Sequence, residues 1–191
     1  MNIILVGYAA SEAAHRLIMN EKPALSCRFS DRFINNALRL TGESQINRDS
    51  IKQMIYESGI QIQDDDILEL SDMGVFGGLW EFADKNKSGL KIYLSKISIL
   101  QETIEICEHL NVNPYTYPSQ GSYIIRTDDA YALADYLCTK QIEASVIGTE
   151  TEENDRIVIN QGEIRYLTPI DRLLKDEQEV KNLRYSERGN K

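Results

Sequence analysis

Two short segments hold the residue types from which a ligand site could be built. The first comprises Ser71, Asp72 and Gly74, which stand just before an apolar helical pattern. Free backbone N–H groups and the helix dipole at a helix N-terminus favour an anion, and a glycine lets it approach closely. A cap formed by Ser71 or Asp72 explains the same residue types, and the Asp72 carboxylate would stand where a phosphate would bind. Anion binding is therefore a hypothesis beside the simpler cap.

The second segment is Ser119, Gln120, Gly121 and Ser122, which leads into a predicted strand. Hydroxyl groups and a glycine suit the binding of a phosphate or a sugar. The same residues suit an ordinary turn, which is the interpretation we favour. These two segments together form the predicted ligand-binding set.

The remaining polar residues predict neither a catalytic group nor a metal site. Asp64–Asp66 and Glu69 could be taken for a divalent-metal cluster, but consecutive carboxylates point in different directions, so a solvated turn explains them better. His15 and His109 have no serine or cysteine at nucleophile spacing, and two histidines are too few for a multi-histidine metal site.

Composition limits the classes of function. The 191 residues include 21 Lys+Arg and 30 Asp+Glu, a net charge of −9, which argues against broad binding to a nucleic-acid backbone. The three cysteines are far apart and lack C-x-x-C spacing, which fits a reducing compartment. No apolar run approaches the ~18 residues of a membrane span, and the N-terminus lacks the basic region of a signal peptide. We therefore expect a cytoplasmic protein that binds neither nucleic acid nor membrane.

Hydrophobic periodicity predicts strands that alternate with helices. Strands are expected at residues 3–6, 67–70, 91–94, 123–126 and 144–147, followed by a hairpin of 156–160 and 163–167 that turns at Gln161-Gly162. Helical stripes are expected at residues 13–18, 33–38 after a Ser30 cap, 51–55 between Asn47 or Asp49 and Gly59, 75–83, 97–110, and 130–138 after Thr127 or Asp128. The hairpin requires antiparallel pairing. We therefore predict an α+β fold with a mixed, largely antiparallel sheet and helices packed on it.

Three stretches, in this order, resemble the C-terminal domain of the aminoimidazole ribonucleotide (AIR) synthetase superfamily, the PurM-like C-terminal domain. Within it, the hydrogenase-maturation carbamoyl dehydratases (HypE-type) and the AIR synthase-related proteins are the most similar. Residues 3–9 and 28–30 resemble the opening strand and helix, 69–81 resemble the H-D-V-T-E-G-G run with its helix, and 121–122 with 142–148 resemble a later strand. In complete relatives, the segment that matches Ser119–Ser122 lies near the ligand cleft. The match extends to about Pro169, which predicts one domain over residues 1–170 and a charged helical or frayed tail over 171–191.

The chain departs from the family pattern at positions that carry chemistry. In the H-D-V-T-E-G-G run, Leu68 replaces the histidine, Met73 replaces the first glycine, and only Gly74 of the glycine pair remains. Carbamoyl dehydratases end in a P-R-I-C-type tail whose cysteine carries the carbamoyl group, whereas this chain has no cysteine after Cys138. Complete members also carry an N-terminal half with the nucleotide-binding carboxylates, the metal and the dimer core. We expect that half to be absent here, because Met1 matches the start of the second domain.

The resemblance therefore implies a stand-alone domain that is not catalytic by itself and that binds a small phosphorylated ligand or a protein partner. The alternative is a subunit of a split ATP-dependent enzyme, hydrogenase-maturation-factor-like or AIR-synthetase-like, that a separate N-terminal half completes. No cofactor is expected on this chain alone, and ATP with Mg²⁺ would enter only with such a half. The expected protein partners are that half or a second copy of the chain, because a separated domain exposes apolar surface.

Overall fold

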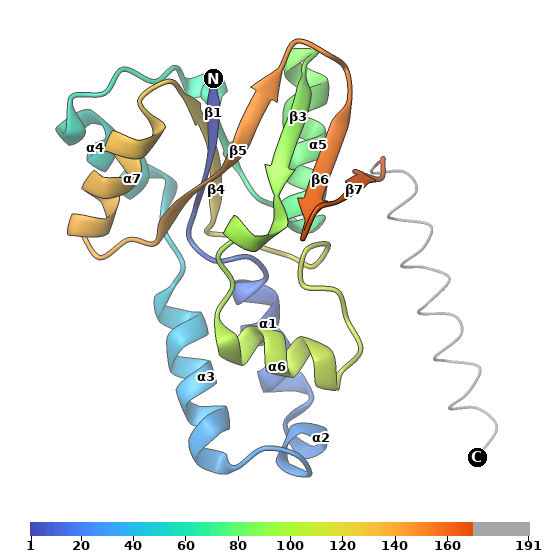
Figure 1. The fold of residues 1–191 in the computed structure, drawn as a ribbon. Helices are drawn as coiled ribbons and strands as arrows, with labels where there is room; N and C mark the ends of the chain where they lie inside the picture. Colours follow the sequence, from blue (N-terminus) through green and yellow to red (C-terminus); the bar gives the residue numbers. More distant parts are fainter. Residues whose placement is uncertain (170–191) are drawn as a thin grey trace.

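A seven-stranded mixed sheet organises residues 1–169, the part of the chain that the computed structural model describes (Figure 1). The strand order is β2-β4-β1-β5-β3-β6-β7. The strands are β1 (Asn2–Val6), β2 (Ile67–Glu69), β3 (Gly89–Tyr93), β4 (Tyr123–Thr127), β5 (Ala144–Thr151), β6 (Arg156–Asn160) and β7 (Glu163–Tyr166). β3 and β6 pair in parallel, and the other neighbours are antiparallel. The predicted α+β class with a mixed, largely antiparallel sheet is confirmed.

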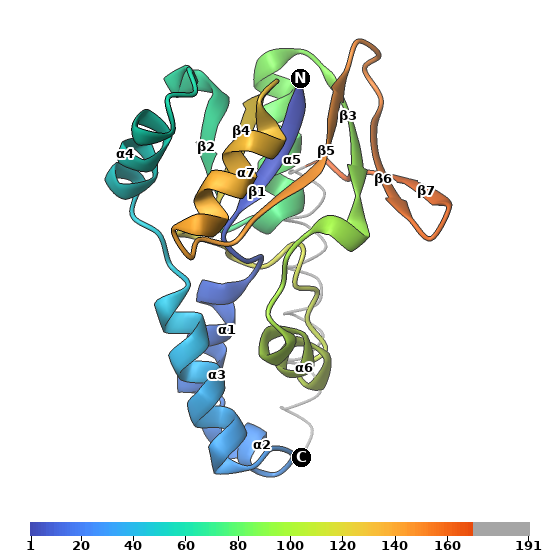
Figure 2. The same ribbon diagram turned by 60° about the vertical axis from the view of Figure 1, so that its left-hand side comes forward.

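The central strand β1 explains why the chain begins with an uninterrupted apolar run. It pairs with β4 on one side and β5 on the other, and both of its faces are covered. Ile3 and Leu5 pack towards α5 (Gly74–Asn86), whereas Ile4 and Val6 pack towards α4 (Arg48–Ser58) and α7 (Ala130–Thr139). A strand buried on both faces needs apolar side chains at every position. Figure 2 shows α4 and α7 on the face of the sheet opposite α5.

Four helices extend beyond the end of β1 and form a separate layer (Figures 1 and 2). They are α1 (Ser11–Asn20), α2 (Lys22–Ser26), α3 (Asp31–Glu43) and α6 (Gln101–His109). Ile18, Leu25, Ile34 and Ile106 contribute one buried side chain from each helix to a small core of their own. His15 is half-buried, and its Nδ1 lies 3.1 Å from the Thr41 hydroxyl, so this histidine holds α1 against α3.

The predicted helix boundaries at Ser30, Asn47 and Gly59 are confirmed. The Ser30 hydroxyl accepts a hydrogen bond from the Phe33 N–H, the Asn47 side chain accepts one from the Asp49 N–H, and Gly59 ends α4 with a φ of 75°. These are the standard side-chain cap and the glycine C-cap.

Three predicted boundaries are wrong. The helix expected from Ile97 begins only at Gln101, because the Ser98 carbonyl accepts a hydrogen bond from the Ala9 N–H (2.9 Å) and holds this segment extended. β5 does not end at Gly148 but continues to Thr151. A Cβ at Gly148 would lie 2.2 Å from the Lys91 carbonyl oxygen of β3, so this glycine allows the two strands to approach and does not mark a strand end. Neither Thr127 nor Asp128 is the N-cap of α7. That position is Asp129, whose N–H donates to the Thr127 hydroxyl.

The predicted tail, residues 171–191, lies outside the described residues. Within the described part, none of the helices combines the length and the apolar character needed to cross a membrane.

Candidate functional site

The two segments predicted to bind a ligand, 48 residues apart in sequence, lie against each other. The Gln120 side-chain amide donates to the Asp72 carboxylate at 2.6 Å, and the Ser119 N–H donates to the Ser71 carbonyl at 3.2 Å. The Leu70 N–H donates to the Ser122 carbonyl at 2.9 Å. We call the meeting point of residues 7–11, 44–47, 70–74 and 115–122 the loop junction. The structure thus brings the predicted residues together, and whether they bind a ligand stays a prediction.

The hydroxyls of Ser119 and Ser122 hold the loop junction together. Ser119 is fully buried, and its hydroxyl accepts from the Ala10 N–H (2.8 Å) and donates to the Tyr117 carbonyl (3.0 Å). The Ser122 hydroxyl donates to the Tyr8 carbonyl (2.9 Å). Both serine hydroxyls therefore already form hydrogen bonds with the backbone of the chain, and a ligand would have to displace these bonds.

Gly121 and Gln120 complete this segment. Gly121 has a φ of 78°, which favours glycine, and its carbonyl accepts from the Ile46 N–H at 3.0 Å. This bond joins the segment to the start of α4. The Gln120 Oε1 is buried and has no hydrogen-bond partner among residues 1–169. Gly121 therefore has a structural role, and Gln120 links the segment to Asp72.

Loop carbonyls close the N-terminus of α5. The N-cap residue is Met73, with no side-chain cap, so neither Ser71 nor Asp72 caps the helix. The Phe76 N–H donates to the Tyr115 carbonyl at 3.0 Å. A side chain at Gly74, where φ is 63°, would come within 2.5 Å of the Tyr117 carbonyl oxygen. Partially negative carbonyl oxygens thus occupy the place that the sequence offered to an anion.

A cavity of about 340 Å³ opens beside the loop junction. Its polar lining includes Glu43, Glu143 and Tyr8, and none of the described residues that line it is a lysine or an arginine. The Glu43 carboxylate is already paired with Arg39 on the same helix at 2.7 Å. Burial, and secondarily the charge of Glu143, raises the pKa of Tyr8, which keeps its hydroxyl protonated as a donor at neutral pH. The Ser98 hydroxyl donates to Glu143 at 2.7 Å. This lining suits a neutral or cationic hydrogen-bonding group better than a phosphate.

Sequence reasoning missed this cavity, because its walls come from segments around residues 7, 45 and 142 that show no common spacing. The weak signals were Tyr8, which directly follows a buried strand and its terminal glycine, and Glu143, which directly precedes another strand.

The other residues considered from the sequence lie apart. The carboxylates of Asp64, Asp65 and Asp66 pair with three different cations, Lys52, Lys85 and Arg126. Among residues 1–169, no three His, Cys, Asp or Glu side chains are grouped in a way that could hold a metal ion. Cys107 is buried, which raises the pKa of its thiol to about 12.

Comparisons with known proteins agree with this architecture. No protein-family model matches the chain. A protein of Methanocaldococcus jannaschii named for hydrogenase expression and formation is 28% identical over 111 residues, which are 56% of this chain and 32% of that protein. The hydrogenase maturation protein HypE of E. coli superposes with a TM-score of 0.65 and 18% identity, over 90% of this chain and 51% of HypE.

Two further solved structures extend the comparison. A chain of a HypE–HypF complex matches with a TM-score of 0.58 and 15% identity, over 88% of this chain and 52% of that one. Thiamine-monophosphate kinase from Stenotrophomonas maltophilia matches with a TM-score of 0.58 and 14% identity, over 85% of this chain and 50% of the kinase. The chain thus spans about half the length of the solved proteins that it matches. It has the α+β fold of the PurM-like proteins, and it is similar to hydrogenase maturation proteins of the HypE type.

Proposed function

We propose that this domain binds a protein partner and does not catalyse a reaction by itself. The observation that carries the proposal is the closure of the α5 N-terminus by the Tyr115 and Tyr117 carbonyls. A phosphorylated ligand needs free N–H donors or cations, and the carbonyl of Tyr115 already takes the Phe76 N–H.

The cavity beside the loop junction argues in the same direction. The Glu143 carboxylate would repel a phosphate, Arg39 is already engaged by Glu43, and none of the described residues that line the cavity is a lysine or an arginine. The described residues therefore do not fit a triphosphate, and a nucleotide at this place would need groups from a second protein unit. Of the two expected ligand classes, a protein partner is the better supported.

The outermost strand offers a surface for such a partner. β7 pairs with β6 on one side, and none of the described residues pairs with its other edge. Ile164 and Tyr166 are 62% and 69% exposed and lie on the same face of β7. An unpaired edge with exposed apolar side chains can add a strand from another chain. A chain of similar fold occurs in a HypE–HypF complex, which supports a protein partner for domains of this kind.

The first experiment measures ligand binding by the chain alone. We expect ATP with Mg²⁺, ADP and inorganic phosphate to leave its melting temperature unchanged, because a ligand of the native state would raise it. A saturable rise in melting temperature with MgATP, accompanied by its hydrolysis, would overturn the proposal.

The second experiment seeks the partner through β7. A tagged chain is cross-linked in its native cells, and any captured protein is then purified and mixed with the chain for light scattering. We expect a complex of fixed stoichiometry, with a separate protein or with a second copy. The double substitution Ile164→Ser and Tyr166→Ser should weaken this complex. The control Tyr131→Ser should not, because Tyr131 is 62% exposed on α7, away from β7. Equal binding by both variants would contradict the use of β7.

The alternative function is a unit that completes an ATP-dependent active site together with a second half. The fold that the chain shares with HypE and with a thiamine-monophosphate kinase favours it. Addition of the second half should then create MgATP binding that neither unit shows alone. A complex that forms without any nucleotide binding would exclude this alternative and leave the first proposal standing.

A further inference from the structure

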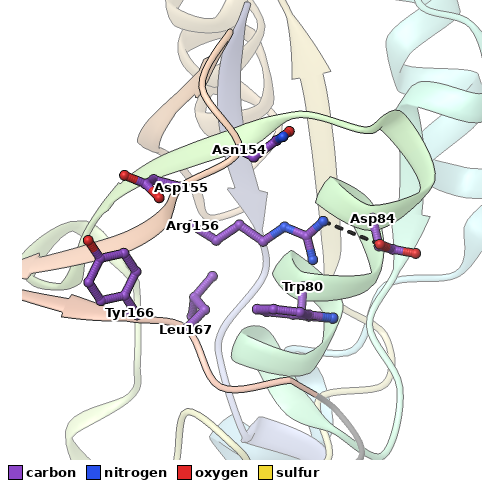
Figure 3. A pocket seen from close by; sticks show the side chains of 7 residues that line it. All are labelled: Trp80, Asp84, Asn154, Asp155, Arg156, Tyr166 and Leu167. Atoms are coloured by element: carbon purple, nitrogen blue, oxygen red, sulfur yellow. Dashed lines mark hydrogen bonds and ion pairs between the residues drawn. The ribbon is translucent and has the colours of Figure 1, made fainter.

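A second pocket, which shares no lining residue with the loop junction, lies between the second half of α5 and the β6–β7 hairpin (Figure 3). Its volume is about 390 Å³. Trp80 and Asp84 come from α5, Arg156 begins β6, and Tyr166 and Leu167 come from the end of β7 and the residue after it. Figure 3 shows the Arg156 side chain crossing the pocket above the Trp80 ring towards Asp84. Tyr166 lies at the opposite end of the pocket from Asp84.

Arg156 is a largely buried cation with few acceptors. Its side chain is 13% exposed, and its guanidinium carbon lies 4.2 Å from the centre of the Trp80 ring. A guanidinium carries five N–H donors. Among the described residues its one hydrogen-bond acceptor is the Asp84 carboxylate, at 3.3 Å, which is long for a charged pair. The other guanidinium nitrogens are not among the buried side-chain atoms that lack a partner, so their N–H donors are open to water or to a ligand in the pocket.

Asp84 can release Arg156 at low cost. Its side chain is 60% exposed, and its other oxygen lies 3.4 Å from the Lys87 ammonium group. If Arg156 turns towards another acceptor, Asp84 therefore keeps a cation and remains in water. A competing anion would gain the buried guanidinium while Asp84 loses only a long, partly exposed pair.

The lining limits the kind of anion. A carboxylate matches the guanidinium fork with two parallel hydrogen bonds. Asp84 and Asp155 bring two negative charges to the pocket, and Arg156 together with Lys87 beside Asp84 offsets them. This balance admits a singly charged carboxylate more readily than a doubly charged phosphate. Trp80, Tyr166 and Leu167 supply aromatic and apolar walls. We propose that this pocket binds a carboxylate attached to a flat apolar group, with Arg156 holding the carboxylate and Trp80 and Tyr166 flanking the apolar part.

The chain carries its own reporter for this site, because Trp80 is its only tryptophan. Tryptophan fluorescence of the full chain is titrated with benzoate, benzamide and benzamidine, which share a shape and differ in charge. We expect a saturable change with benzoate and at least tenfold weaker binding of the other two. Benzamidine binding more tightly than benzoate, or no saturable change with benzoate, would overturn the proposal.

Three variants separate binding from a purely structural role of Arg156. Arg156→Met should weaken benzoate binding at least tenfold. Asp84→Asn should strengthen it several-fold, because the competing carboxylate is gone. Arg165→Met, on the exposed β7 outside the pocket, is the matched arginine control and should change nothing. Far-UV circular dichroism checks the fold of each variant. If Asp84→Asn weakens benzoate binding or leaves it unchanged while the fold is intact, Arg156 only fastens the hairpin to α5 and the proposal fails.

The source of the carboxylate is distinguished with a peptide arm. N-acetyl-glycyl-phenylalanine ends in a free carboxylate, and its C-terminal amide is the control. Tighter binding of this acid than of benzoate would assign the pocket to a chain terminus, and the reverse order would assign it to a small free acid. Binding of the amide as tight as the acid would contradict the role of Arg156.

Discussion

Gly74→Ala tests whether the 115–117 loop closes the N-terminus of α5. Gly74 has a φ of 63°, and a Cβ there would lie 2.5 Å from the Tyr117 oxygen and 2.8 Å from both the Thr116 carbonyl carbon and the Tyr115 oxygen. All three atoms belong to backbone, so the loop itself must move. Such a movement would break the hydrogen bond from Phe76 to Tyr115.

The expected loss follows from these contacts. An alanine in the left-handed region costs about 1 kcal/mol relative to glycine. Two hydrogen bonds, from Phe76 to Tyr115 and from Ser119 to Tyr117, are lost as the loop moves and cost about 1 kcal/mol each. The total is therefore about 3 kcal/mol of unfolding free energy. Gly59→Ala is the matched control, because Gly59 has a φ of 75° but nothing lies within 4 Å of a Cβ there. The control should lose only the first ~1 kcal/mol.

The assay is urea unfolding of the wild type and both variants, followed by circular dichroism. An unchanged m-value with a lower midpoint shows that stability alone has changed. The two variants should differ by about 2 kcal/mol, which for a chain of this length corresponds to roughly 4–8 °C in melting temperature. If Gly74→Ala costs no more than Gly59→Ala, the loop does not press on α5, and the argument against a phosphate site there collapses.

Three other perturbations test contacts described above. Ser119→Ala should destabilise the fold by about 1–3 kcal/mol in urea unfolding, because a buried backbone N–H loses its acceptor; a change within error would refute the role of this hydroxyl. Arg126→Met should lower the unfolding free energy by about 3 kcal/mol, because it leaves the mostly buried carboxylates of Asp66 and Glu150 without their cation. The control Lys85→Met breaks an exposed pair and should be close to neutral, and similar losses in the two variants would contradict the role of burial. Burial raises the folded-state pKa of Cys107 and Tyr123 to about 12, from ordinary values of 9.0 and 10.0. The contribution of these two groups to the unfolding free energy should therefore be constant up to about pH 8 and fall as the pH rises towards 12. A flat profile between about pH 8 and 12 would show that these groups are not buried.

Local patterns predicted the elements that local physics decides. The apolar run at residues 3–6 predicted a buried strand, and Ser30, Asn47 and Gly59 marked helix ends through side-chain and glycine chemistry that acts within four residues. The helical stripe through Ile97 misled, because that residue is buried for a tertiary reason. It packs in the core directly after a short 3-10 turn, Leu94–Lys96, and is itself extended.

The candidate site shows the same division. The sequence identified both segments of the loop junction but not their roles. The acceptor that closes α5 is the backbone carbonyl of Tyr115, about 40 positions after Phe76. Because every residue has a backbone carbonyl, the residue type at position 115 gives no sign of this hydrogen bond. The Arg156–Trp80 stack joins residues 76 positions apart and was likewise invisible before the fold was known.

The position of β1 has a consequence for how the chain is made. This strand is synthesised well before both of its partners, which come from residues 123–151. At typical synthesis rates those partners follow roughly 6–30 s later. During that interval Ile3–Val6 is an apolar segment with two unpaired edges, the kind of template on which chains aggregate. Pairing across such a sequence separation is also slow. A chain cut short before residue 144 would keep one flank of β1 open, so interrupted synthesis yields a sticky intermediate rather than a smaller stable domain.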